Sequence, residues 1–205
     1  MSFQWIIDNA AEIVVNTQGI VSSSVTRDGT VSSVARGGQP WVFTITLPDG
    51  PRWTDYRELI ATAERYDRHT EQSINFANSN YNWMFAYQGD LTPPNGNGTF
   101  NGDWGSGFDT FTMTGGSGSG NRVVAGDFLQ LTTNGHVYKV VETSASNDTS
   151  IRVHRPIIEE AGTGEVSVGG ACNFRVKCTQ FPKPRIFARN QVGWTGAFIF
   201  VEVID

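Results

Sequence analysis

Apolar and polar positions alternate with a period of two along most of this chain, which is the pattern of β-strands that bury one face. Residues 41–47 and 172–178 show the alternation most clearly, because every second side chain there is apolar. Further short runs follow between residues 127 and 178 at the spacing of about 8–12 residues that is typical of an all-β sandwich or barrel. Residues 71–76 and 83–87 also resemble strands. The pattern therefore predicts a mainly β fold.

A helical period of apolar positions stands out in one segment. Over about residues 54–67, apolar residues recur at helical spacing and form one stripe: Tyr56, Leu59, Ile60, Ala63 and Tyr66. In a chain of strands, such a stripe packs against a sheet. We therefore expect one α-helix, over about residues 54–67, flanking the β-structure.

A hairpin is expected near the N-terminus, where residues 21–25 and 31–34 flank Arg27, Asp28, Gly29 and Thr30. Asp-Gly between two β-prone runs is a strong signal for a tight turn. Both runs carry serine where a core strand would carry leucine or isoleucine. The hairpin is therefore either an exposed edge or the lining of a wet surface.

Residues 88–122 differ from the rest of the chain because they are rich in glycine and proline. We expect an insertion or an extended loop here. Aromatic residues interrupt the glycines, which a plain linker does not require. They would anchor the segment either to its own body or to a neighbouring subunit. These aromatic residues are Phe100, Trp104, Phe108 and Phe111.

Composition narrows the class of protein. The chain has 205 residues, of which 17% are charged, and a formal net charge of −5. The aromatic content of 12% argues against disorder. The acidic balance argues against a basic nucleic-acid binder, and the sequence holds no apolar run of about 20 residues that would span a membrane. No secretory signal is expected at the N-terminus.

The cysteines are expected to be reduced. If Cys172 and Cys178 lie on one strand, their Cα atoms are about 20 Å apart, and a disulfide needs a separation below about 7 Å. We therefore expect two buried thiols.

Catalytic signals are weak. His69, His136 and His154 show no metal-ligand spacing, and no known nucleophile motif is present. Glu159 and Glu160 are adjacent carboxylates that we expect to be solvated. We therefore expect no enzyme activity, no cofactor and no bound metal. One alternative is a carbohydrate-binding β-sandwich that uses exposed Trp83, Trp104 and Trp194 as stacking platforms.

Several segments resemble tail-tip and baseplate proteins of long-tailed bacteriophages. They cover most of the chain outside about residues 88–122, and they are 27–30 (RDGT), 37–43 (GGQPWVF), 51–57 (PRWTDYR), 125–131 (AGDFLQL), 136–140 (HVYKV), 151–157 (IRVHRPI), 168–176 (VGGACNFRV) and 194–202 (WTGAFIFVE).

The resemblance implies a tail-tube-like β-sandwich or barrel formed by residues 1–87 and 123–205, with 88–122 inserted. It also implies a ring of identical subunits, expected to be a hexamer, between the tail tube and the baseplate hub. DNA would pass through the ring without specific binding, and the protein would reside in the virion.

Two groups of site residues follow from this expectation. The residues expected at subunit interfaces or on the channel wall are Ser22, Ser24, Arg27, Asp28, Gly29, Ser32, Trp41 and Phe43. Those expected to contact partner proteins are Phe100, Trp104, Phe108 and Phe111.

Overall fold

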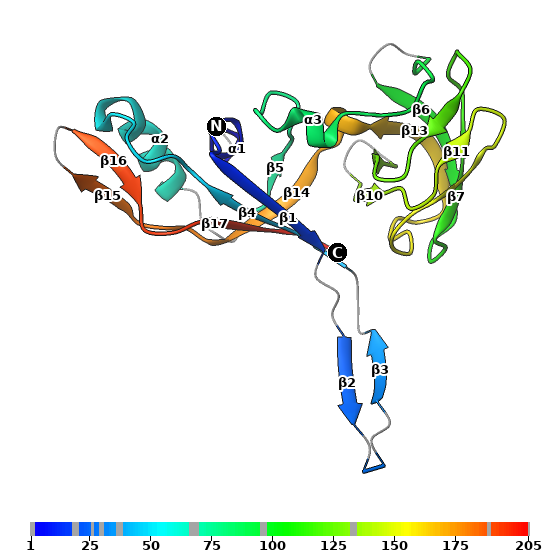
Figure 1. Ribbon diagram of the computed structural model, residues 1–205, viewed down its shortest axis with the longest axis horizontal. Coiled ribbons are helices and arrows are strands. Elements are labelled where there is room, and N and C mark those ends of the chain that lie inside the picture. Colours follow the sequence, from blue (N-terminus) through cyan, green and yellow to red (C-terminus); the bar gives the residue numbers. More distant parts are fainter. Residues whose placement is uncertain are drawn as a thin grey trace.

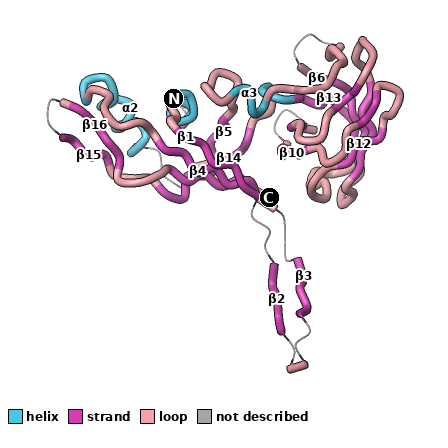
Figure 2. The backbone as a smooth tube through the Cα atoms, in the orientation of Figure 1, coloured by secondary structure: helices cyan, strands magenta, loops and turns pink. Residues whose placement is uncertain are grey.

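The computed structural model describes residues 3–17, 21–25, 27–28, 31–35, 39–65, 70–94, 98–131, 135–187 and 190–204. These residues form seventeen strands and three α-helices. The expected mainly β fold with a flanking helix is thereby confirmed. The strands are grouped around two curved sheets, and a separate hairpin projects from one of them (Figures 1 and 2).

The first sheet has five antiparallel strands in the order β1-β4-β17-β14-β5. Their bounds are Glu12–Thr17, Trp41–Thr46, Phe198–Glu202, Phe174–Gln180 and Gln72–Ile74. Alternate side chains point to a common inner face. Phe43, Ile45, Phe174 and Phe200 are fully buried there, as the period-two pattern predicts.

The three helices contribute to the core on this inner face. They are α1 (Gln4–Asp8), α2 (Trp53–Arg65) and α3 (Asn82–Phe85). Ile6, Ile60 and Phe85, one from each helix, belong to the same buried cluster as the sheet residues. The predicted helix therefore exists as α2; residues 66–67 of the prediction lie outside the described residues. The strand expected over residues 83–87 is wrong, because α3 occupies most of it.

The second sheet has six strands in the order β10-β9-β13-β6-β7-β12. Their bounds are Val137–Lys139, Phe128–Gln130, Gly162–Val168, Thr99–Trp104, Thr110–Thr114 and Ser150–Arg152. This sheet curls until its two edges meet at a bridge between Val140 and Val153. It encloses a second buried cluster that includes Phe100, Met113 and Tyr138. We call this part, residues 87–168, the barrel.

Residues 88–122 are therefore not an extended loop. They supply β6, β7 and β8 (Asn121–Val123), and β8 pairs with β11 (Ser144–Ala145). The boundary expected at residue 122 cuts through the barrel, because β6 pairs with β13 further along the chain. A glycine-rich composition does not prevent strand formation where neighbouring strands complete the backbone hydrogen bonds.

The two sheets are connected by a short 3₁₀ turn, Gly169–Ala171, between β13 and β14. Gly169 has a φ of +60°, and a Cβ atom there would lie 2.6 Å from the backbone nitrogen of Tyr87. Only glycine fits this approach without displacing the Tyr87 backbone. Just after the turn, Cys172 is buried, and Cys178 is buried within β14, as expected for core thiols.

Candidate functional site

A two-stranded hairpin, which we call the arm, extends from the end of β1 and the start of β4. Its strands are β2 (Val21–Val25) and β3 (Val31–Ala35), paired in register from Val21–Ala35 to Val25–Val31. The arm stands clear of both sheets (Figure 1). Ser22, Ser24 and Ser32 lie in its strands, Arg27 and Asp28 are exposed near its tip, and Gly29 lies outside the described residues. The predicted hairpin therefore exists.

Both edges of the five-stranded sheet, β1 and β5, lack a neighbouring strand in the described part of the chain. The backbone N–H of Ala11 donates to the carbonyl oxygen of Thr46 in β4. That bond lies one residue outside the register of β1 and β4, so the direction of the other donors follows from the neighbouring strands.

The N–H of Val203, directly after β17, donates to the carbonyl oxygen of Arg175 in β14. Because successive N–H groups of a strand point in opposite directions, the registers across the sheet direct those of Ile13, Val15 and Thr17 away from β4. β1 therefore presents unused donors along its free edge. By the same alternation, the N–H of Ser73 in β5 points away from β14.

The outer face of the five-stranded sheet has mixed character. The register aligns Asn16, Val42, Val201 and Lys177 in one row across four strands. Val42 and Val201 in this row are only half-buried. All three helices contribute to the core on the opposite face. The outer face is therefore a β-surface without a covering helix among the described residues.

Trp41 and Phe43, which were expected at a subunit interface or channel wall, lie elsewhere. They are 3% and 0% exposed and face the inner core. The side chains that β4 presents outward are Val42, Thr44 and Thr46. The expectation therefore selected the wrong face of this strand, although the alternation itself was correct.

The aromatic residues expected to contact partners are mostly core residues of the barrel. Phe100, Trp104 and Phe111 are at most 5% exposed, and the Trp104 indole N–H donates to the carbonyl oxygen of Glu160 at 3.0 Å. They anchor the segment to its own body, which was one of the two alternatives. Phe108 is 65% exposed and is the member of this group that remains accessible.

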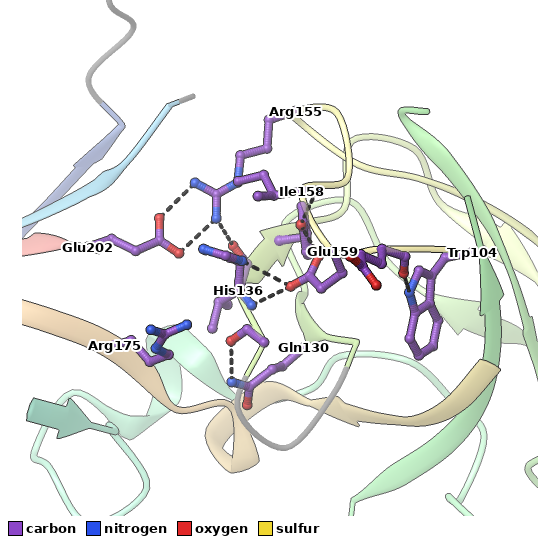
Figure 3. Close-up of polar contacts among 12 residues, drawn as sticks. Trp104, Gln130, His136, Arg155, Ile158, Glu159, Arg175 and Glu202 are labelled. Atoms are coloured by element: carbon purple, nitrogen blue, oxygen red, sulfur yellow. Dashed lines mark hydrogen bonds and ion pairs between the residues drawn. The ribbon is translucent and has the colours of Figure 1, made fainter. Parts of the chain in front are cut away.

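A buried ion pair joins the two sheets at the root of the arm (Figure 3). Arg155, which follows β12, contacts both carboxylate oxygens of Glu202 in β17 at 2.7 Å, and both side chains are 1% exposed. Arg155 also donates to the carbonyl oxygens of Gln39 and Val137, while Glu202 accepts the backbone N–H of Trp41. These bonds fix the point where the chain returns from the arm to β4.

Sequence reasoning missed this pair, although a signal was present. Glu202 follows Phe198 and Phe200 at the inward-pointing positions of β17, and Arg155 follows Ile151 and Val153 in the same way. A charged residue at an inward position of an alternating pattern indicates a buried and paired charge.

A second polar cluster surrounds Glu159 (Figure 3). Its carboxylate lies 3.1 Å from Nδ1 of His136 and accepts bonds from the His136 backbone N–H and the Tyr138 hydroxyl. Burial alone would raise the pKa of Glu159, but these hydrogen bonds outweigh it and lower the pKa below its ordinary value. The expectation of a solvated Glu159 is therefore wrong, while Glu160 is exposed.

The Glu159 cluster resembles a carboxylate that orients a catalytic histidine. His136 is, however, only 7% exposed, and its Nε2 atom is buried and has no hydrogen-bond partner in the described chain. A general base must reach a proton on the substrate. The geometry therefore supports a structural role, in which Glu159 ties β10 to the turn that precedes β13.

Two hollows open between the inner face of β1 and the barrel, with volumes of about 640 and 530 Å³. They share five lining residues and together form what we call the inner groove. The shared residues are Val15, Trp41, Ala125, Gly126 and Lys139. The groove is a candidate for a ligand site among the described residues.

Among the described residues, no group of three or more His, Cys, Asp or Glu side chains could hold a metal ion. None of the helices in the same residues is long and apolar enough to span a membrane. Compared with known proteins, the chain matches no protein-family model and no curated sequence. A function must therefore be argued from the chain's own residues and geometry.

Proposed function

We propose that this protein is a non-enzymatic structural component of a bacteriophage tail tip or baseplate. It forms a ring, expected to be a hexamer, that joins the tail tube to the hub around the DNA channel. The observation that carries the proposal is the five-stranded sheet, which combines two free edges, β1 and β5, with an outer face that no helix covers.

Free edges favour ring assembly for a physical reason. An exposed edge is a template for pairing with another chain, and monomeric proteins usually protect it. Here the two edges lie at opposite sides of one sheet, so that β1 of one copy can pair with β5 of the next. Such a head-to-tail contact generates a closed ring when the rotation between copies divides a full turn.

The outer face would then line the channel. It carries Glu12, Lys177 and the ion pair between Arg175 and Glu71. Acidic and basic residues are both present on the outer face, so this face does not concentrate the net charge of −5. A surface with opposite charges close together attracts phosphates less than a basic lining does, which is compatible with the passage of DNA without specific binding.

The sharpest test removes one outward donor of β5. The Ser73→Pro change, at an exposed position, deletes an N–H that points away from β14, so the ladder within the chain stays intact. We expect the unmodified protein to sediment as a ring-sized oligomer and Ser73→Pro to sediment as a monomer with a similar melting temperature. The matched control Ser73→Thr keeps both the N–H and the hydroxyl group and should still assemble.

Two results would contradict the proposal. One is an oligomer of Ser73→Pro that is indistinguishable from the unmodified protein. The other is electron cryomicroscopy of the parent particle that places the chain away from the tube axis.

The carbohydrate alternative retains one of its three aromatic platforms. Trp104 and Trp194 are 5% and 8% exposed, and Trp194 packs against Phe198 with ring centroids 5.0 Å apart. Trp83 is 66% exposed and lines the inner groove. Of these three tryptophans, Trp83 in the groove is therefore the one that a saccharide can reach.

A further inference from the structure

Trp83 is an exposed aromatic residue on a firmly anchored element. It lies in α3, two residues before Phe85, whose ring stacks on Phe76 with centroids 3.9 Å apart and planes 7° apart. Phe85 is 1% exposed, whereas Trp83 is 66% exposed. The core thus holds the helix while the indole remains in solvent, although burying it would be favourable. An exposed aromatic side chain on a fixed support is suited to stacking on a ligand.

The hollow beside Trp83 has the size and the mixed polarity of a small-ligand site. Its volume of about 530 Å³ falls within the range of about 300–1,000 Å³ that is typical of such sites. Trp41 and Phe128 supply apolar surface, and Gln88 supplies an amide. Gln39 adds a second amide where the groove continues into the neighbouring hollow. The lining therefore offers both stacking surfaces and hydrogen-bonding groups.

The charges in the groove favour an anion. Asp127 lines it, but its two carboxylate oxygens accept the backbone N–H groups of Gln88 and Val124, both at 2.9 Å. Lys139 lines both hollows, and no carboxylate of the described residues pairs with it. The accessible charge in the groove is therefore the Lys139 ammonium group.

His154 lies at the other end of the groove and adds no charge to it. Its Nδ1 atom accepts the backbone N–H of Lys139 at 3.0 Å, so the proton of the neutral ring lies on Nε2. That atom is buried and has no partner in the described chain. Burial, together with the charges of Arg155 and Lys139, lowers the pKa of His154 to about 3, and the ring stays neutral. The charged group that a ligand in the groove reaches is therefore Lys139.

We propose that the inner groove binds an anionic saccharide. A sugar ring stacks on Trp83, its carboxylate or phosphate group pairs with Lys139, and its hydroxyl groups bond with the amides of Gln88 and Gln39. This inference does not depend on ring assembly. A saccharide suits this lining because it combines an exposed indole with amides and one cation. Grooves that bind amphipathic helices are instead hydrophobic, and those that bind proline-rich segments are lined by aromatic residues.

The test measures binding of matched charged and neutral probes by isothermal titration calorimetry. Trigalacturonate is compared with its neutral methyl ester, and maltotriose 6-phosphate with maltotriose, so that the two pairs distinguish carboxylate from phosphate as the recognised group. We expect the preferred acid to bind about tenfold more tightly than its neutral counterpart, as a charge-assisted hydrogen bond allows.

Variants then assign the contacts. Lys139→Gln should abolish the preference for the acid, and Trp83→Ala should weaken acid and neutral forms alike by about tenfold or more, with Trp83→Tyr restoring part of the affinity. Lys183→Gln and Phe108→Ala change an exposed cation and an exposed aromatic residue outside the groove, and both should bind like the unmodified protein. All four sites are surface positions, so melting temperatures should stay close.

The proposal is overturned if no probe binds at millimolar concentration, or if Lys139→Gln keeps the preference for the acid. It also fails if an acidic peptide competes as well as the saccharide, which would make the groove a peptide site. A change in oligomeric state in Trp83→Ala, with saccharide binding unchanged, would instead assign the groove to a second copy of the chain. Because Ser73 lies outside the lining of the groove, the assembly test and this test can fail separately.

Discussion

Charged residues in the interior determine how the two sheets are joined. Arg155 and Glu202 are both inaccessible to solvent and neutralise one another. A buried pair contributes little net stability relative to apolar residues, but the loss of one partner leaves an uncompensated charge. This asymmetry makes the coupling between the two side chains measurable in a double-mutant cycle.

We expect Arg155→Met and Glu202→Leu to lower the free energy of unfolding by about 3–5 kcal/mol each. The double variant should cost clearly less than the sum, because it leaves no unpaired charge behind. Urea unfolding of all four proteins measures this coupling. For comparison, Arg152→Met disrupts an exposed pair with Asp109 and should cost far less, because solvent screens the charges of an exposed pair. Additive losses at Arg155 and Glu202 would contradict the buried pair.

The arm is the element that receives the least support from the rest of its own chain. A two-stranded hairpin alone is at best marginally stable in water, and this one stands clear of both sheets (Figure 1). Val25 in the arm is 69% exposed. These features are those expected of an element that packs against another subunit.

Deletion of residues 21–35 tests the role of the arm. The remaining residues 18–20 and 36–40 can connect β1 to β4, because the ladder between these strands ends at the Thr17–Trp41 pair. We expect the melting temperature to change little, since the arm stands clear of both sheets (Figure 1), while self-association is lost. Differential scanning fluorimetry and sedimentation velocity measure the two quantities. If the deletion variant still assembles, the free edges alone carry the interface.

At the scale of the whole molecule, the chain has two buried clusters rather than one. The cluster of the barrel is drawn from residues 87–168, a continuous stretch. The cluster of the five-stranded sheet combines residues from both ends of the chain with Phe128 and Val137 of the barrel. The barrel is therefore inserted into the other part of the fold.

A continuous stretch with its own core should fold by itself. We expect a fragment of residues 86–170 to melt cooperatively, as followed by circular dichroism, with a lower melting temperature than the full chain because Phe128 and Val137 lose contacts. A fragment of residues 123–168, which begins at the boundary expected from sequence, separates β13 from β6 and should stay unfolded. A non-cooperative transition in the longer fragment would show that the barrel needs the five-stranded sheet.

The sequence by itself determined what depends on local periodicity. Alternation correctly identified the buried face of β4 and β14, the helical stripe identified α2, and Asp28-Gly29 identified the hairpin. These features are readable because a strand or helix places side chains on one face by its own geometry, whatever it packs against.

Only the tertiary structure decided what depends on contacts between distant residues. Gly102 lies inside β6, where a Cβ atom would come within 2.5 Å of the Val166 side chain, so this glycine reflects close packing rather than a loop. Residues 83–87 are mostly helical because Phe85 stacks on Phe76. Arg155 meets Glu202, and Trp83 lines a groove with Lys139, across 47 and 56 positions of the chain. Period and composition describe neighbours along the chain, and these contacts arise only when the sheets fold together.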